Sequence, residues 1–240
     1  MPAAPEPSAP PAVTEGSVPS DRPKPTGPPS PQAAPATPAA TLLTLDLAAT
    51  IRHDGHGGVA DDLDAPGGLT AWVRAHAAEL PDALGPRRFR ADESAREAVR
   101  GVRAAVRALF AHAVRPGAPS PADARRLLPV REAVTRLNEA AARVPTVPVL
   151  SWPRGGAPVV RDEPVDRAEA VAGTDLLTAA LARAALTFFA GPDRERLRAC
   201  HAPRCVRYFL KDHPRQEWCK PACGNRARVA RHHERNRGRA

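Results

Sequence analysis

The chemistry that the sequence suggests is concentrated in four cysteines near the C-terminus of the 240-residue chain. Four residues separate Cys200 from Cys205, three separate Cys219 from Cys223, and thirteen lie between the two pairs. A short turn can aim two thiolates at one point, and a connecting stretch of this length can bring two such turns together. The spacing therefore predicts that all four cysteines bind one structural Zn²⁺ ion in a tetrahedral site.

Two disulfides, or four free thiols, would also account for the four cysteines. The N-terminus has no apolar segment of signal-peptide type, and the chain contains no run of 18 apolar residues, so we expect a cytoplasmic protein that does not enter a membrane. In a reducing compartment, paired cysteines are more often metal ligands than disulfides. Four histidines are reserve ligands if one cysteine lies elsewhere: His201, His213, His232 and His233.

A catalytic role for the metal is disfavoured, because four thiolates fill a tetrahedral shell and leave no position for water or substrate. Elsewhere the sequence shows no nucleophile with its base, no glycine-rich phosphate loop and no carboxylate pair on a defined element. We therefore expect that the protein is not an enzyme. Trp218, which precedes the third cysteine, is expected to pack against the metal site rather than to stack on a nucleic-acid base.

The net charge of +9 is concentrated around the cysteines. Residues 194–240 contain fourteen Lys and Arg against four Asp and Glu, a balance of +10, whereas the preceding 193 residues have a balance of −1. Four thiolates and one Zn²⁺ ion add about −2, so the segment stays strongly basic when metal is bound. A basic patch of this kind predicts a polyanionic partner, above all a nucleic acid.

The residues after Cys223 predict a helix, because they contain few strand formers and many arginines. A metal ligand just before this helix would fix its first turn. We expect the helix to bind duplex DNA. The alternatives are an RNA-binding or ribosome-associated module, and a protein-interaction or ligand-sensing protein whose zinc is purely structural. The residues assigned to nucleic-acid contact are Asn225, Arg226, Arg228, Arg231 and Arg235.

The rest of the chain predicts a mainly α-helical fold in three parts: a disordered Pro/Ala-rich tail at 1–40, a helical domain at 41–192 and a small zinc-finger module at 193–240. The tail holds thirteen of the 29 prolines and almost no large apolar side chain. Residues 41–50 suit either a helix or a buried strand, and 53–68 resemble a loop. Apolar periodicity and capping residues predict helices at 69–80, 93–114, 120–128, 130–143 and 166–190, and a β-hairpin within 147–162.

Two further expectations concern basic stretches. In the finger, a short basic helix from 194 should lead to Cys200, and a strand at 206–210 should pair across a turn with the chain before Cys219. The helix at 93–114 carries a row of arginines opposite its apolar side, and we expect this row to be solvated surface, with phosphate contact as the alternative. The arginines of the row are Arg96, Arg100, Arg103 and Arg107.

The second cysteine pair carries a resemblance to a known family. Trp218-Cys219, followed by Cys223-Gly224-Asn225-Arg226, is similar to the signature of the CGNR zinc fingers. The first pair, Cys200 and Cys205, matches the first ligand pair of that family. The resemblance implies zinc binding by these four cysteines, and DNA binding.

Upstream segments resemble the helical ABATE domain, which accompanies this finger in stress-induced transcription regulators. The matching segments are LDLAAT at 45–50, the helix with Trp72, Arg96-Glu97-Ala98, Leu137-Asn138 and the long helix before the first cysteine. One departure is Ala49, where the family pattern has an Asn before the Thr. The resemblance implies a transcription regulator, and we expect its helical domain to sense a signal or to form a homodimer.

Overall fold

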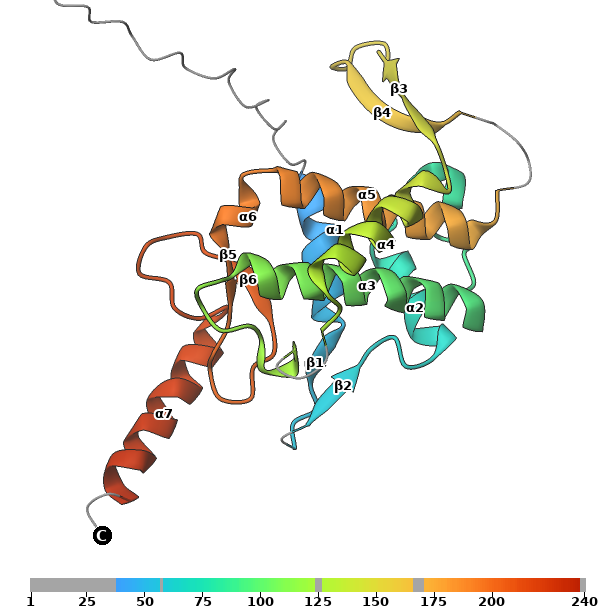
Figure 1. Ribbon diagram of the computed structural model, residues 1–240. Helices are drawn as coiled ribbons and strands as arrows, with labels where there is room; N and C mark the ends of the chain where they lie inside the picture. Colours follow the sequence, from blue (N-terminus) through green and yellow to red (C-terminus); the bar gives the residue numbers. More distant parts are fainter. Residues whose placement is uncertain (1–37, 57, 124–126, 166–170, 238–240) are drawn as a thin grey trace, which may run out of the picture. The chain divides into compact units, whose positions relative to one another are not determined.

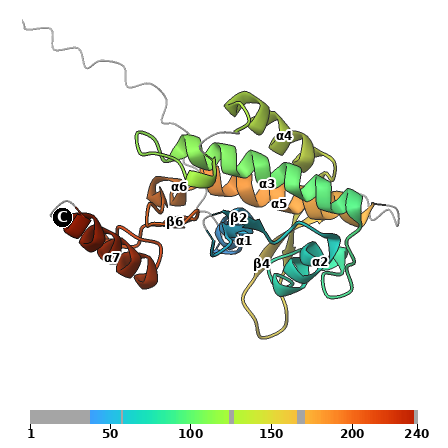
Figure 2. The ribbon, with the colours of Figure 1, turned by 90° about the horizontal axis from the view of Figure 1, so that it is seen from below.

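Two long helices, α3 (Glu93–Ala113) and α5 (Gly173–Ala190), lie side by side at the centre of the helical domain in the computed structural model (Figure 1). Helix α1 (Pro38–Ala49) packs against both, and α4 (Val130–Ala142) packs against both from another side (Figure 2). Helix α2 (Pro66–Ala75) contacts α3. The structure describes residues 38–56, 58–123, 127–165 and 171–237.

Short elements connect these helices and form the finger. Within the described ranges there are three two-stranded antiparallel sheets, β1–β2, β3–β4 and β5–β6. The predicted fold class, mainly α with small hairpins and a C-terminal cysteine module, is therefore confirmed. The remaining elements are β1 (Ile51–His53), β2 (Val59–Asp61), η1 (Asp82–Leu84), η2 (Pro121–Asp123), β3 (Thr146–Ser151), β4 (Val159–Pro164), α6 (Asp193–Arg196), β5 (Leu197–Ala199), β6 (Tyr208–Leu210) and α7 (Pro221–Arg237).

Helix α3 forms where its capping and periodicity predicted it. The Asp92 side chain accepts a hydrogen bond of 2.7 Å from the backbone N–H of Ala95, which caps the first turn. Val99, Val106 and Phe110 have no exposed surface. Each such side chain contributes about 1.5–3 kcal/mol by leaving water. The helix is therefore held by one broad apolar face.

The beginning of the domain differs from the prediction in two respects. Of the two alternatives for residues 41–50, the helix is the one that forms, up to Ala49, but α1 begins at Pro38, three residues before the predicted start. The stretch predicted as loop contains the hairpin β1–β2, in which Ile51 pairs with Asp61. Three-residue strands are too short to give a recognisable periodicity. Residues 1–37 of the predicted disordered tail lie outside the described part of the chain.

The arginine row of α3 is largely buried, so the prediction of solvated surface was wrong. Arg96, Arg103 and Arg107 expose 8%, 5% and 4% of their surface. Arg103 donates to both carboxylate oxygens of Asp61, and Arg107 does the same with Asp123. A buried guanidinium is costly unless a carboxylate meets it. These carboxylates come from β2 and η2, so α3 alone does not reveal them, although helix geometry places Arg103 within about 40° of the buried Val99 and Phe110.

Three predicted helices are shorter than expected. Helix α2 ends at Ala75 rather than at residue 80, and α5 begins at Gly173, while residues 166–170 lie outside the described ranges. The predicted helix at 120–128 is the single turn η2 in its described part. Helix α4 agrees with its prediction. Of the apolar residues whose spacing predicts an inward side, Leu137 is fully buried, whereas Val134 is 41% exposed.

The predicted hairpin within 147–162 is present as β3–β4, and its turn contains Gly155 in the left-handed region at φ 77°. The finger begins differently. Between residue 192 and Cys200 the helix is only the short α6, and the chain then forms strand β5. Strand β6 pairs with β5, as in Leu197 opposite Leu210, and not with the chain before the third cysteine. The apolar residue pattern Leu197, Ala199 suits a strand whose inner face joins the core.

Candidate metal centre

The four cysteine sulfurs meet at one point. Cys200 and Cys205 lie on the loop between β5 and β6, Cys219 precedes α7, and Cys223 lies in the first turn of α7. All four sulfur atoms lie within 4.8 Å of one another, and three of the four residues are buried. No other group of three or more potential ligands in the described ranges lies so close together. The cluster therefore needs none of the reserve histidines.

Tight turns aim the sulfurs of the first pair. The backbone N–H of Cys200 donates to the carbonyl of Arg207 at 2.9 Å, which continues the β5–β6 ladder. The backbone N–H of Cys205 donates to the carbonyl of Ala202 at 2.9 Å and closes a turn. Arg204 within this turn has a φ of 63°. A residue with a Cβ atom pays about 1–2 kcal/mol for that conformation, so the turn is held by its surroundings.

The sulfur–sulfur distances fit a zinc ion. Four sulfurs placed about 2.3 Å from a tetrahedral Zn²⁺ ion are about 3.8 Å apart. The distances are 3.7 Å between Cys205 and Cys219 and 3.5 Å between Cys219 and Cys223. A disulfide requires about 2.05 Å, and all four cysteines are free thiols. The geometry and the donor set agree with one zinc ion held by four thiolates.

The neighbouring thiols also polarise one another. Hydrogen bonds from Cys200 and then Cys219 lower the pKa of Cys205 to about 3. Hydrogen bonds with Cys200 and Cys205, followed by burial, raise the pKa of Cys219. One thiolate is therefore favoured in the cluster, and its charge opposes a second. A divalent cation attracts all four thiolates, so zinc binding should release protons.

A small apolar cluster surrounds the sulfurs. It includes Ala202 and Phe209, and Trp218 packs against it. The indole lies close to the first turn of α7, because a Cβ atom at Gly224 would be 3.0 Å from Trp218 Cδ1. A larger residue at position 224 would therefore displace the ring. These contacts confirm the predicted packing role of Trp218 and explain the glycine that follows the last ligand.

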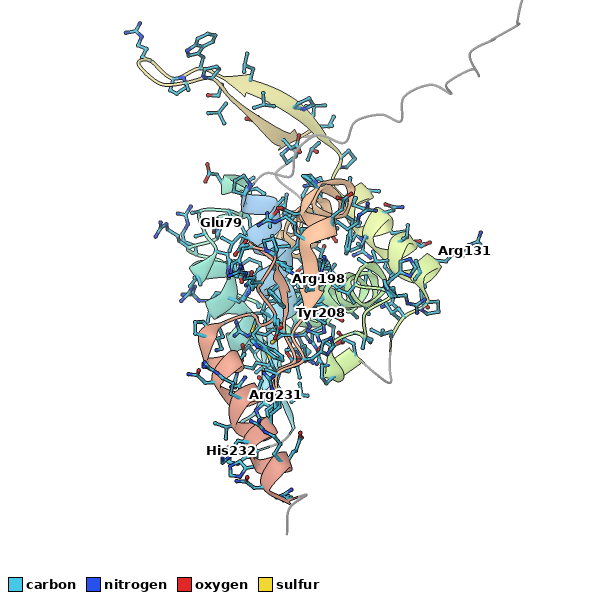
Figure 3. The ribbon with its side chains drawn as sticks, turned by 90° about the vertical axis from the view of Figure 1, so that its left-hand side faces the viewer. Glu79, Arg131, Arg198, Tyr208, Arg231 and His232 are labelled. Atoms are coloured by element: carbon cyan, nitrogen blue, oxygen red, sulfur yellow. The ribbon has the colours of Figure 1, made fainter. Side chains whose placement is uncertain are left out.

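The finger shares the core of the helical domain. Leu197 of β5 has no exposed surface, and Tyr208 of β6 has 7%. The Tyr208 ring meets the Phe110 ring edge-on, with centroids 5.1 Å apart. Figure 3 labels Tyr208 on this hairpin and Arg231 on α7. The strands β5 and β6 thus give side chains to the helical core while their connecting loop carries two metal ligands.

A buried polar network fastens that loop to the helical domain. Arg107 donates through Nε and Nη2 to the two carboxylate oxygens of Asp123, each at 2.9 Å. The Tyr208 hydroxyl donates to Asp123 at 2.7 Å, and burial followed by this carboxylate raises the pKa of Tyr208. The Ser120 hydroxyl donates to the carbonyl of Val206 at 2.8 Å. Val206 directly follows a metal ligand, so the network holds one half of the site.

Sequence reasoning missed this network. Ser120-Pro121-Ala122-Asp123 was interpreted as the capped start of a helix, because this residue pattern is typical of one. In the structure Ser120 and Asp123 are both buried and bind residues 85 or more positions further along the chain. The Ser120 hydroxyl still accepts a 3.4 Å hydrogen bond from the backbone N–H of Ala122, as a cap does, but Ser120 and Asp123 also bind the finger. No signal near residue 120 indicates that partner.

The five residues assigned to nucleic-acid contact all lie on α7, but they have different surroundings. The Asn225 side chain accepts a hydrogen bond of 2.6 Å from Arg228. Arg226 lies 3.1 Å from the sulfur of Cys223. Arg228, Arg231 and Arg235 are exposed, and no ion pair joins them to any residue in the described ranges. We call these last three arginines the basic stripe.

Comparisons with known proteins agree with this arrangement. Residues 41–192 match the ABATE family, described as "Putative stress-induced transcription regulator". Residues 196–236 match the CGNR zinc finger and include all four clustered cysteines. None of the curated proteins compared with the chain matches it. No helix in the described ranges has the length and apolar character needed to cross a bilayer. Because the first match covers more than half of the sequence, the chain belongs to the ABATE family, and a zinc-binding CGNR finger follows its helical domain.

Proposed function

We propose that the protein is a DNA-binding transcription regulator of the cytoplasm that responds to stress, and that zinc holds α7 in position for binding. The description of the ABATE family supports the regulatory role. The finger and its charge of +10 over residues 194–240 support a nucleic-acid partner. The helical domain would receive the signal, and the shared core would connect it to the finger. The protein is not proposed to be an enzyme, because four thiolates leave zinc no open position.

The basic stripe is the observation that carries the proposal. At about 100° per residue, Arg228, Arg231 and Arg235 fall within about 60° of the circumference of α7. The buried Ala227 and Cys223 lie beside the stripe, about 40° and 80° around the helix from Arg231. An α-helix fits the major groove of duplex DNA, where arginine binds phosphates or guanine edges. A helix that is anchored along one edge and exposes three arginines next to that edge suits this contact.

A salt series with duplex DNA tests the proposal. Each phosphate contact steepens the dependence of log affinity on log salt concentration by about 0.9. The double variant Arg228→Ala/Arg231→Ala should therefore bind more weakly and lose about 1.8 from that slope. A matched control, Arg74→Ala/Arg131→Ala, removes the same charge from exposed positions on α2 and α4. Equal affinity and slope for both variants and the wild type would refute the proposal.

RNA is the nearest alternative partner, because basic zinc modules also bind RNA. Competition separates the two. Unlabelled duplex DNA should displace a labelled duplex at a lower concentration than structured RNA does, with the salt concentration held fixed. Displacement by RNA at the lower concentration would assign the finger to RNA.

A sensing or dimerising role for the helical domain has its own support. A hollow of about 920 Å³ between α1, α5, η1 and β4 is lined by apolar side chains such as Leu43 and Leu176 and, to a similar extent, by polar and charged residues such as Arg183. On the hairpin β3–β4, Leu150, Trp152 and Val160 are 63%, 71% and 62% exposed. Surfaces of this kind suit a small ligand or a second copy. Analytical sedimentation tests dimerisation. The wild type should sediment with the mass of a dimer and Leu150→Ser/Val160→Ser with the mass of a monomer, and a wild type of monomer mass would exclude a dimer.

A further inference from the structure

Arg226 is turned toward the metal site. Its Nη2 atom lies 3.1 Å from the sulfur of Cys223, three residues earlier on α7. Cys223 has no exposed surface. A guanidinium forms strong hydrogen bonds with anions, about twice as strong as those between neutral groups. The contact is therefore most favourable when Cys223 is a thiolate, which is its form as a zinc ligand.

Helix geometry separates Arg226 from the basic stripe. At about 100° per residue, Arg226 lies between about 140° and 180° around α7 from Arg228, Arg231 and Arg235. A duplex that lies against the stripe meets one side of the helix. Arg226 then lies on the other side, together with the sulfur it contacts. The two groups of arginine therefore have different neighbours and different tasks.

The negative charge of the zinc–thiolate cluster makes a nearby cation favourable. Four thiolates and one Zn²⁺ ion carry about −2, and burial makes such a charge costly. Among the described residues, the other hydrogen bonds that reach the sulfurs come from neighbouring cysteines and from the backbone of Arg207. Within the described ranges, Arg226 is the one cationic side chain with a hydrogen bond to any of them. Its single positive charge offsets half of the charge of the zinc–thiolate cluster.

We propose that Arg226 stabilises the zinc-bound finger by donating to the Cys223 thiolate, which tightens zinc binding and lowers the reactivity of that sulfur. Three of the four residues of the CGNR signature then serve the metal site: Cys223 as ligand, Gly224 as the space for Trp218, and Arg226 as the counter-charge. The inference rests on the zinc site and stands apart from the proposal about DNA.

Zinc competition in the full-length protein tests this role. A chromophoric chelator of known affinity is titrated against the zinc-loaded wild type, Arg226→Ala, Arg226→Lys and Arg228→Ala. Removing a group that binds a metal ligand typically costs 10–100-fold in metal affinity, so we expect Arg226→Ala to lose about that factor. Arg226→Lys should fall between, because an ammonium keeps the charge but not the planar fork. Arg228→Ala removes the same charge from the same helix and should match the wild type.

Two further measurements distinguish a metal role from a DNA contact. Alkylation of the zinc-loaded protein by iodoacetamide should be faster in Arg226→Ala than in Arg228→Ala, since an unshielded thiolate is the better nucleophile. At saturating zinc, Arg226→Ala should keep the salt slope of DNA binding, whereas Arg228→Ala should lose about 0.9. Wild-type zinc affinity and alkylation rate in both Arg226 variants would overturn the inference. So would a loss of salt slope in Arg226→Ala with its zinc affinity unchanged.

Discussion

The Tyr208 hydroxyl donates a 2.7 Å hydrogen bond to Asp123, although 85 residues separate them in the chain. Asp123 also receives both hydrogen bonds of the Arg107 guanidinium, so one buried carboxylate joins the finger to α3. This contact crosses the boundary between the two matched families. The network therefore links the β5–β6 part of the finger to the helical domain, and we expect its loss to destabilise both.

Removing the Asp123 carboxylate should lower the free energy of unfolding strongly. Asp123→Asn leaves Arg107 buried without a counter-charge, and breaking a buried ion pair costs about 3–5 kcal/mol. Urea unfolding followed by circular dichroism measures the loss. The control is Asp175→Asn, whose partner Arg143 is 59% exposed and whose loss should cost at most about 1 kcal/mol. Similar losses in both variants would contradict the importance of the network.

The Asp61–Arg103 pair should give stability a dependence on pH. Burial by itself raises the pKa of Asp61. Hydrogen bonds from Arg103 and Leu63 and the charge of Arg103 lower it by more, so the pKa of Asp61 lies below its usual range. A lowered pKa stabilises the fold above the unfolded value of about 3.9, and that contribution disappears as pH falls through the folded value.

The expected observation is therefore a difference that depends on pH. The free energy of unfolding of the wild type should exceed that of Asp61→Asn by a constant amount between pH 5 and 8, a range set by about one unit above the unfolded pKa. Below about pH 4 the two should converge. Zinc loss at low pH affects both proteins and cancels in the comparison. A difference that grows on acidification would show that the sign is wrong.

Gly224→Ala should weaken the metal site although it lies in a helix. Alanine normally stabilises a helix interior by about 1 kcal/mol relative to glycine, but here the new Cβ would lie 3.0 Å from Trp218 Cδ1. We expect lower zinc affinity in chelator competition. Gly101→Ala on α3 is the matched control, because no atom lies within 4 Å of its new Cβ, and it should raise the unfolding free energy. Unchanged zinc affinity in Gly224→Ala would show that the indole moves freely.

Removing zinc with a chelator should unfold part of the finger. Without zinc, α7 keeps two buried residues, Cys223 and Ala227, and little else to hold it. Strands β5 and β6 keep Leu197 and Tyr208 in the helical core. Hydrogen exchange should therefore become fast along α7 while β5, β6, α3 and α5 stay protected. Equal exchange rates along β5 and α7 after chelation would refute this division.

The sequence predicted the metal ligands and the long helices, but not the contacts between them. Cysteine spacing depends on local turns, and α3 and α5 have periodicities long enough to recognise. The partners of the buried arginines could not be predicted, because Arg103 and Arg107 depend on carboxylates in other elements. The contact between Arg226 and the Cys223 sulfur was not predicted either. The charge of Arg226 suggests phosphate, whereas its place three residues after Cys223 sets its contact with the sulfur.

The helical core holds one pair of zinc ligands in place and leaves the other pair unsupported. Cys200 and Cys205 are placed by the β5–β6 hairpin, while Cys219 and Cys223 arrive with α7. Binding zinc therefore closes one loop of thirteen residues, from Cys205 to Cys219. Such a closure has a length-dependent entropic cost of about 2 kcal/mol plus a constant, far less than ordering a whole domain. The metal thus works as a latch that joins α7 to a first ligand pair already held in place by the core.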